Sequence, residues 1–122
     1  MPSYHVVPLN AVVGVSIHGE LDLESTRKLV LGVARSATAA GKNLLIDLRD
    51  VRTSMSYPDV YKVVQLVAQH PRVFGGRLAL LDTYDSEFEK TQFFEASSAE
   101  SGLQARAFID EDRAIAWLEE TA

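Results

Sequence analysis

The sequence has no cysteine among its 122 residues. This excludes disulfides, thiolate catalysis and cysteine-based zinc sites, and it is compatible with a reducing cytosol. The unbroken apolar runs are only a handful of residues long, far short of a membrane span. Residues 1–5 carry neither the basic nor the apolar segment of a signal peptide. We therefore expect a cytoplasmic protein with no membrane span.

Positive charge is scarce as well. Twelve lysines and arginines stand against 17 acids, for a net charge of −5. A nucleic-acid binder presents a basic face, so we expect no nucleic-acid partner. The hydrophobic content of 47% is typical of a globular chain, and the length fits a single domain over residues 1–122.

Catalytic and metal-binding motifs are also missing. His5, His18 and His70 stand in no nucleophile–base motif, and the chain has no His-Glu-x-x-His, EF-hand or phosphate-loop pattern. The acids at 110–112 are explained by the start of a helix, whose positive end attracts them. We therefore expect no metal, no cofactor and no enzymatic activity.

What the chain does contain is a regular alternation of apolar patterns. Strand patterns cover 4–7, 11–17, 43–48, 77–81 and 103–109. Helical spacing follows capping residues at 22, 56, 85 and 110, and the first three helices end near 41, 70 and 102. The order β-β-α-β-α-β-α-β-α predicts an α/β fold. Its mixed sheet is mostly parallel after an N-terminal hairpin, with helices packed on it.

The strand at 43–48 is predicted to be central. Leu44 and Leu48 share one face and Leu45 lies on the other, which is typical of a strand covered on both sides. Asp47 interrupts this pattern, and we expect it to pair with a nearby arginine or a backbone donor. The alternative is an enzyme that uses Asp47 and Asp82 as acid and base with a hydroxyl at the rim of the sheet.

The run Ser56-Tyr57-Pro58-Asp59 has the signals of a helix start: serine at the N-cap, proline in the first turn and an acid three residues on. One interpretation is that Ser56 only caps the helix. The other is that it is phosphorylated, because a phosphate there would meet backbone N–H groups and the positive end of the helix dipole. The carboxyl ends of parallel strands, where Ser56 is expected, are the usual binding edge of open α/β sheets.

Several of these runs resemble a known family. Gly19-Glu20-Leu21-Asp22, then Leu45-Ile46-Asp47-Leu48-x-x-Val51, then Ser56 are similar to the STAS domain of anti-sigma-factor antagonists. Residues 108–118 resemble the tail of the stand-alone sporulation-antagonist-like (SpoIIAA-like) branch, which is related in fold to CRAL-TRIO lipid-binding domains.

The resemblance implies specific roles. In such antagonists the phosphorylated serine begins the second helix, and its loop docks on an anti-sigma kinase. Ser56 matches this serine, Asp22 matches an acidic position near it, and Met55 stands where antagonists carry an aspartate.

We therefore expect a non-enzymatic regulatory or protein-binding module whose partner is a regulatory kinase or anti-sigma-like protein. Its candidate docking residues are Ser56, Asp22, Asp50, Arg52, Ser54, Tyr57 and Asp59. The alternative is a small carrier of an apolar or lipid-like ligand between sheet and helices, with Tyr61, Phe88, Phe94 and Trp117 as pocket candidates, unless these aromatics only fill the core. An apolar face on the helix at 60–68 or on the final helix would also suit a homodimer.

Overall fold

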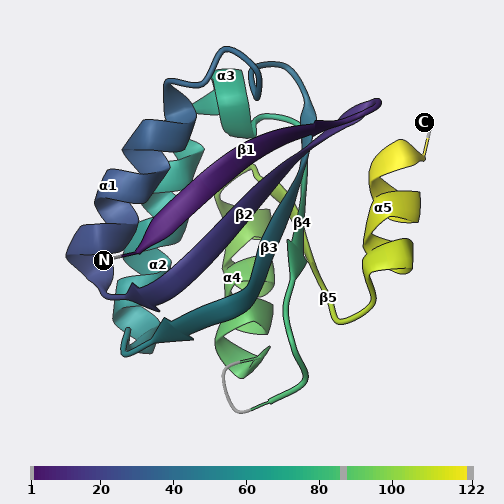
Figure 1. Ribbon diagram of the computed structural model, residues 1–122. Helices are drawn as coiled ribbons and strands as arrows, with labels where there is room; N and C mark the ends of the chain where they lie inside the picture. The colour runs from purple at the N-terminus through teal and green to yellow at the C-terminus, as the bar shows by residue number, and fades with distance from the viewer. Residues whose placement is uncertain (1, 86–87, 121–122) are drawn as a thin grey trace.

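The computed structural model describes residues 2–85 and 88–120 and has a five-stranded sheet covered by helices (Figure 1). The strands are β1 (Ser3–Leu9), β2 (Val12–Leu21), β3 (Asn43–Thr53), β4 (Arg77–Leu81) and β5 (Gln104–Phe108). The helices are α1 (Leu23–Ala34), α2 (Tyr57–Ala68), α3 (Pro71–Phe74), α4 (Phe88–Glu100) and α5 (Glu111–Glu119). The strands lie side by side in chain order, with β1 antiparallel to β2 and the other pairings parallel. The predicted α/β fold is confirmed.

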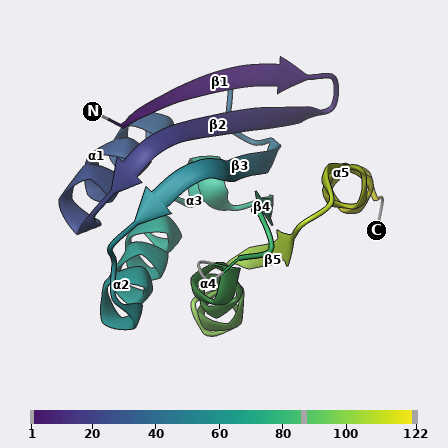
Figure 2. The ribbon, with the colours of Figure 1, turned by 60° about the horizontal axis from the view of Figure 1, so that its bottom comes forward.

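The helices cover the two faces of the sheet unequally (Figure 2). Of the helices in residues 2–85 and 88–120, α1 to α4 pack on one face and α5 covers part of the other. Leu44 is buried toward the four helices and Leu45 toward α5, as the two-sided apolar pattern predicts. Strand β3 is therefore the middle of both cores. None of the described helices is long and apolar enough to cross a bilayer.

The predicted helix starts are confirmed at three caps. Asp22 accepts a hydrogen bond of 2.8 Å from the backbone N–H of Ser25, and Ser56 accepts one of 3.2 Å from that of Asp59. Asp110 caps α5 through the N–H of Asp112 at 2.9 Å. The fourth predicted cap, Asp85, precedes α4, and residues 86 and 87, between it and the first described residue of this helix, lie outside the described residues.

Three boundaries differ from the sequence prediction by more than two residues. Strands β2 and β3 continue to Leu21 and Thr53 because they pair with each other along their length, which keeps the polar residues 18–20 and 49–53 in the sheet. Helix α1 ends at Ala34 instead of near Gly41, and the chain turns through the alanine-rich segment, where Ala39 is fully buried. The short helix α3 was not predicted; it places two apolar side chains in the core.

The central position of β3 gives a test of the core. Leu44→Ala should lower the free energy of unfolding by about 2–5 kcal/mol, because it leaves a cavity where the side chain is fully buried. Urea denaturation measures the loss. Leu9→Ala is the matched control, since this leucine of β1 is 37% exposed and should cost less than about 1 kcal/mol. Equal losses in the two variants would contradict the assignment of β3 as the centre.

Candidate functional site

The ends of β2 and β3 form an open polar hollow. Leu21 pairs with Thr53 at these ends, and the Thr53 hydroxyl donates to the Leu21 carbonyl at 2.9 Å. The hollow has a volume of about 330 Å³ and is lined by Glu20, Leu21, Asp22, Arg52, Thr53 and Ser54. Three of the predicted docking residues, Asp22, Arg52 and Ser54, therefore share one exposed surface that carries both signs of charge.

Asp22 joins this hollow to the start of α1. Hydrogen bonds from Ser25, first from its backbone N–H, hold the pKa of the Asp22 carboxyl below its usual range. The Ser25 hydroxyl in turn accepts from the Asp22 N–H at 3.0 Å, which completes a capping box. Asp22 is thus a fixed, exposed negative charge at the rim.

Ser56 is the N-cap of α2 and lies three residues after the end of β3 at Thr53. Its side chain and that of Asp59 form a second capping box, with the Ser56 N–H donating to Asp59 at 3.4 Å. Tyr57 follows, with its ring edge-on to Phe93 at 5.1 Å between centroids and its hydroxyl 3.4 Å from Glu89. These contacts tie the start of α2 to α4 and leave Ser56 exposed.

Met55 is the site residue that sequence reasoning gave no role. Its side chain is buried, and its sulfur lies 3.7 Å from the Thr26 hydroxyl of α1. Its backbone N–H donates to the Thr53 hydroxyl at 3.0 Å. At the position where the family resemblance implies an aspartate, this chain therefore carries a methionine whose side chain is buried in the core.

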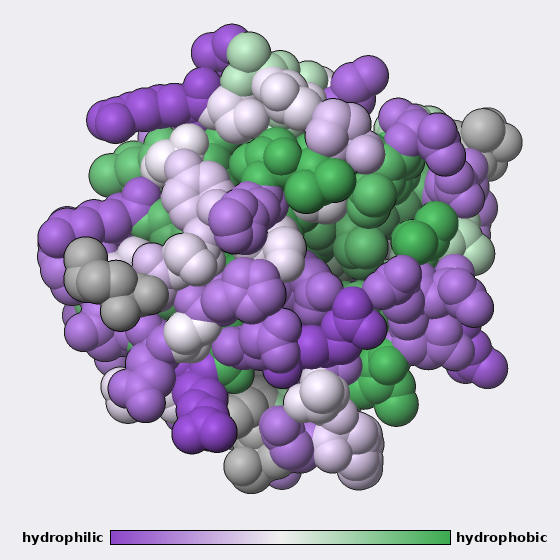
Figure 3. All heavy atoms as spheres, viewed as in Figure 1, coloured by the Kyte–Doolittle hydropathy of each residue, from purple (hydrophilic) through white to green (hydrophobic). Residues whose placement is uncertain are grey.

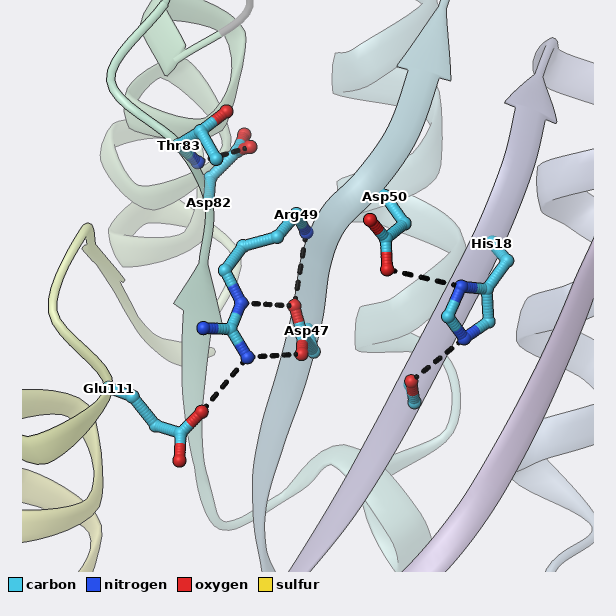
Figure 4. A network of polar contacts seen from close by, with 8 residues as sticks. His18, Asp47, Arg49, Asp50, Asp82, Thr83 and Glu111 are labelled. Carbon is cyan, nitrogen blue, oxygen red and sulfur yellow. Dashed lines mark hydrogen bonds and ion pairs between the residues drawn. The ribbon is translucent and has the colours of Figure 1, made fainter.

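Asp50, another of the predicted docking residues, does not line this hollow. The structure pairs it with His18 across the sheet, at 3.3 Å from Nδ1, because a register shift in the β2–β3 pairing sets these residues opposite each other (Figure 4). Ser16 lies 3.1 Å from the other ring nitrogen of His18. A serine–histidine–carboxylate order is the order of acyl-transfer triads. Ser16, however, lies in a strand paired on both sides, whose N–H groups serve the sheet instead of an oxyanion.

Asp47 pairs with an arginine, as predicted. Arg49 makes two side-chain hydrogen bonds to it, at 3.0 and 2.8 Å, and reaches Glu111 of α5 at 2.9 Å (Figure 4). Partial burial raises the pKa of Asp47, but the hydrogen bonds from Arg49 outweigh it, so the pKa lies below the usual 3.8. Asp82 is held separately, by the Thr91 hydroxyl at 2.7 Å and the Thr83 N–H at 2.8 Å. Each carboxylate thus has its own hydrogen-bond donors.

A second space, an apolar cavity of about 150 Å³, lies between the sheet and helices α1, α2 and α4. Of the four aromatic pocket candidates, only Phe94 is in its lining. Tyr61 is exposed on α2, Phe88 packs near Tyr84, and Trp117 packs against Phe108 on the other face of the sheet. Most of the other lining side chains are aliphatic, because β-branched residues are frequent on the facing strands and on α2.

The fold is similar to two solved structures of other proteins. An uncharacterized protein with a SpoIIAA-like fold from Shewanella loihica has 16% identity and a TM-score of 0.60, with 96% of this chain and 93% of that chain covered. An anti-sigma factor antagonist from Mycobacterium paratuberculosis has 13% identity and a TM-score of 0.66, with 98% and 96% covered. No protein-family model and no curated protein matches the chain. The comparisons confirm a STAS-like, SpoIIAA-like fold.

The Asp47–Arg49 pair predicts a pH-dependent loss of stability. Asp47→Asn should lower the free energy of unfolding by about 1 kcal/mol at pH 7, a value reduced by the partial exposure of both groups. Because the folded pKa is depressed, the stabilisation is complete above pH 3.8 and is lost as the pH falls through the folded pKa. Urea unfolding at several pH values measures the difference between wild type and variant.

That difference should shrink below pH 4, and a constant difference down to pH 2 would contradict the account. Asp50→Asn is the control, since its carboxylate is 71% exposed and should contribute little.

Proposed function

We propose that this protein is a non-enzymatic, cytoplasmic regulatory module that docks a protein partner through the Ser56 surface. This surface comprises Asp22, Arg52, Ser54, Ser56, Tyr57 and Asp59. The observation that carries the proposal is the convergence of Asp22, Arg52 and Ser54 on one exposed hollow, with the capped helix start at Ser56 beside it. Mixed charges around an exposed aromatic side chain are suited to recognition of another protein.

Ser56 is the proposed switch of this surface. Its hydroxyl oxygen is exposed and already accepts from a backbone N–H at the positive end of α2. A phosphate on that oxygen keeps acceptor atoms at the cap, so the helix start survives the modification. The change is then one of charge, about two negative units added beside Asp22 and Asp59, and a partner would sense it as repulsion or attraction.

The solved structures support a partner of regulatory type. The Mycobacterium protein is an anti-sigma factor antagonist, and this chain shares its fold over nearly the full length of both. A regulatory kinase or an anti-sigma-like protein is therefore the proposed partner.

The second candidate function, a small carrier of an apolar ligand, has one observation in its favour, the apolar cavity. Its lining is mostly aliphatic, with Phe74 and Phe94 as its aromatic members, so the carrier would recognise its ligand by shape and apolar character.

The valines of α2 are buried in the protein's own core, so a homodimer would have to form through another surface. Val60, Val63, Val64 and Val67 are all buried in their own core. In Figure 3 apolar side chains reach the surface between the β1–β2 hairpin and α5. Among the large hydrophobic residues of β1, Tyr4, Val7 and Leu9 stay exposed.

Two variants with side chains of equal size separate the effect of added negative charge at position 56 from the capping role of the side chain. Ser56→Asp and Ser56→Asn both provide good N-caps, but only the first adds charge. We expect Ser56→Asp to change the amount of at least one partner by tenfold or more in quantitative affinity purification from the native host. Ser56→Asn should behave as wild type.

Ser56→Ala is the stability control and should cost about 1 kcal/mol through loss of the cap, as measured by urea unfolding. If Asp and Asn variants recovered the same partners in the same amounts as wild type, the charge switch would be rejected.

A further inference from the structure

The apolar cavity between the sheet and the helices supports an inference that goes beyond docking at the Ser56 surface. We infer that it is the binding site for one small apolar molecule, about the size of a benzene ring, and that its occupancy is transmitted to the Ser56 surface through Met55. The binding part deepens the second candidate function and does not depend on docking at the Ser56 surface, whereas the transmission part rests on that docking proposal.

The size of the cavity sets the size of the ligand. Its volume is about 150 Å³, with walls from β2, β3 and β4 and from α1, α2 and α4. Val15, Val30, Val63, Leu78 and Phe94 are among the side chains that face it. Protein interiors hold few voids larger than a water molecule, so a space of this volume is unusual. Apolar cavities of about this volume in other proteins stay dry and take up benzene or xenon, whereas a whole acyl chain needs more room.

The polar atoms in the walls favour an apolar ligand. The three threonine hydroxyls all donate to the protein itself: Thr26 to the Asp22 carbonyl at 2.7 Å, Thr53 to the Leu21 carbonyl at 2.9 Å and Thr91 to Asp82 at 2.7 Å. The two charged groups of the lining, Asp82 and Lys90, are likewise engaged within the chain. A polar ligand would have to compete with these bonds, and an apolar ligand would leave them intact.

Residues that flank Ser56, the proposed switch, are also part of the cavity lining. Thr53, Met55 and Val60 belong to its lining, and they lie on both sides of Ser56 in the chain. The Met55 side chain enters the core while its backbone is bonded to Thr53 at 3.0 Å. A bound molecule therefore adds dispersion contacts to both flanks of Ser56 and stabilises the local structure that presents it.

Benzene titration of the purified full-length chain, labelled with ¹³C at the methyl groups of Met, Leu and Val, tests the binding site. We expect saturable NMR shifts at Met55, Val63 and Leu78, whose side chains line the cavity. Leu45 and Leu118, buried on the opposite face with α5, are internal controls and should not shift. No shift at the cavity methyl groups at the solubility limit of benzene would overturn the proposal.

Matched variants test the location. Val63→Phe fills the cavity and should weaken benzene binding at least tenfold, whereas Val7→Phe adds the same ring on exposed β1 and should leave it within twofold. If Val63→Phe fails to fold, Val30→Leu makes a smaller intrusion and should still weaken binding measurably. Sodium palmitate is the size control. If it shifted the same methyl groups at lower concentration than benzene, the single-ring assignment would be overturned in favour of a lipid carrier.

Amide hydrogen exchange tests the transmission to the surface. Benzene should slow exchange at the amide hydrogens of residues 56, 57, 59 and 60 at least threefold in wild type and leave it unchanged in the cavity-filled variant. Unchanged exchange in wild type, with benzene bound, would overturn the transmission part. Both measurements use the purified chain without a partner, so their outcome does not depend on whether the Ser56 surface docks one.

Discussion

The structure depends on the parallel pairing of β2 with β3 along their whole length. This pairing brings Leu21 next to Thr53, so the two chain segments leave the sheet at the same edge. Each then enters a helix through a side-chain cap, Asp22 for α1 and Ser56 for α2. The polar hollow and the helix starts around it are therefore consequences of one register, in keeping with the rule that open α/β sheets bind at the carboxyl ends of their strands.

The unequal cover of the sheet explains the second feature of the molecule. Four helices share one face, and the sheet bends between them and α5 (Figure 2). The side of α2 that faces the sheet is built from valines, which are short and stiff, and valines on β2 and α1 face them. Short side chains on facing elements leave the apolar cavity next to Met55. Met55, one of the residues that line this cavity, is thus the direct neighbour of the exposed Ser56.

Much of the fold could be predicted from local chemistry. Leu44 and Leu45 indicated a strand buried on both faces, and the N-cap residues Asp22 and Ser56 indicated helix starts. The expected arginine partner of the half-buried Asp47 carboxylate is Arg49. What failed depended on distant contacts. The ends of β2 and β3 are strands only because they pair, and the alanine-rich segment leaves the helical path because Ala39 is buried. Likewise, the contact of His18 with Asp50 follows from a register shift that no local pattern indicates.

The most direct test of the central claim, that Ser56 is the regulated residue of the docking surface, is a phosphorylation map of the protein purified gently from its own host. Intact mass before and after phosphatase, followed by peptide sequencing, gives the occupied position. The account predicts one phosphate, on Ser56, in a fraction of the molecules. Phosphate found only on other hydroxyls, or a chain that carries none across growth conditions, would contradict it.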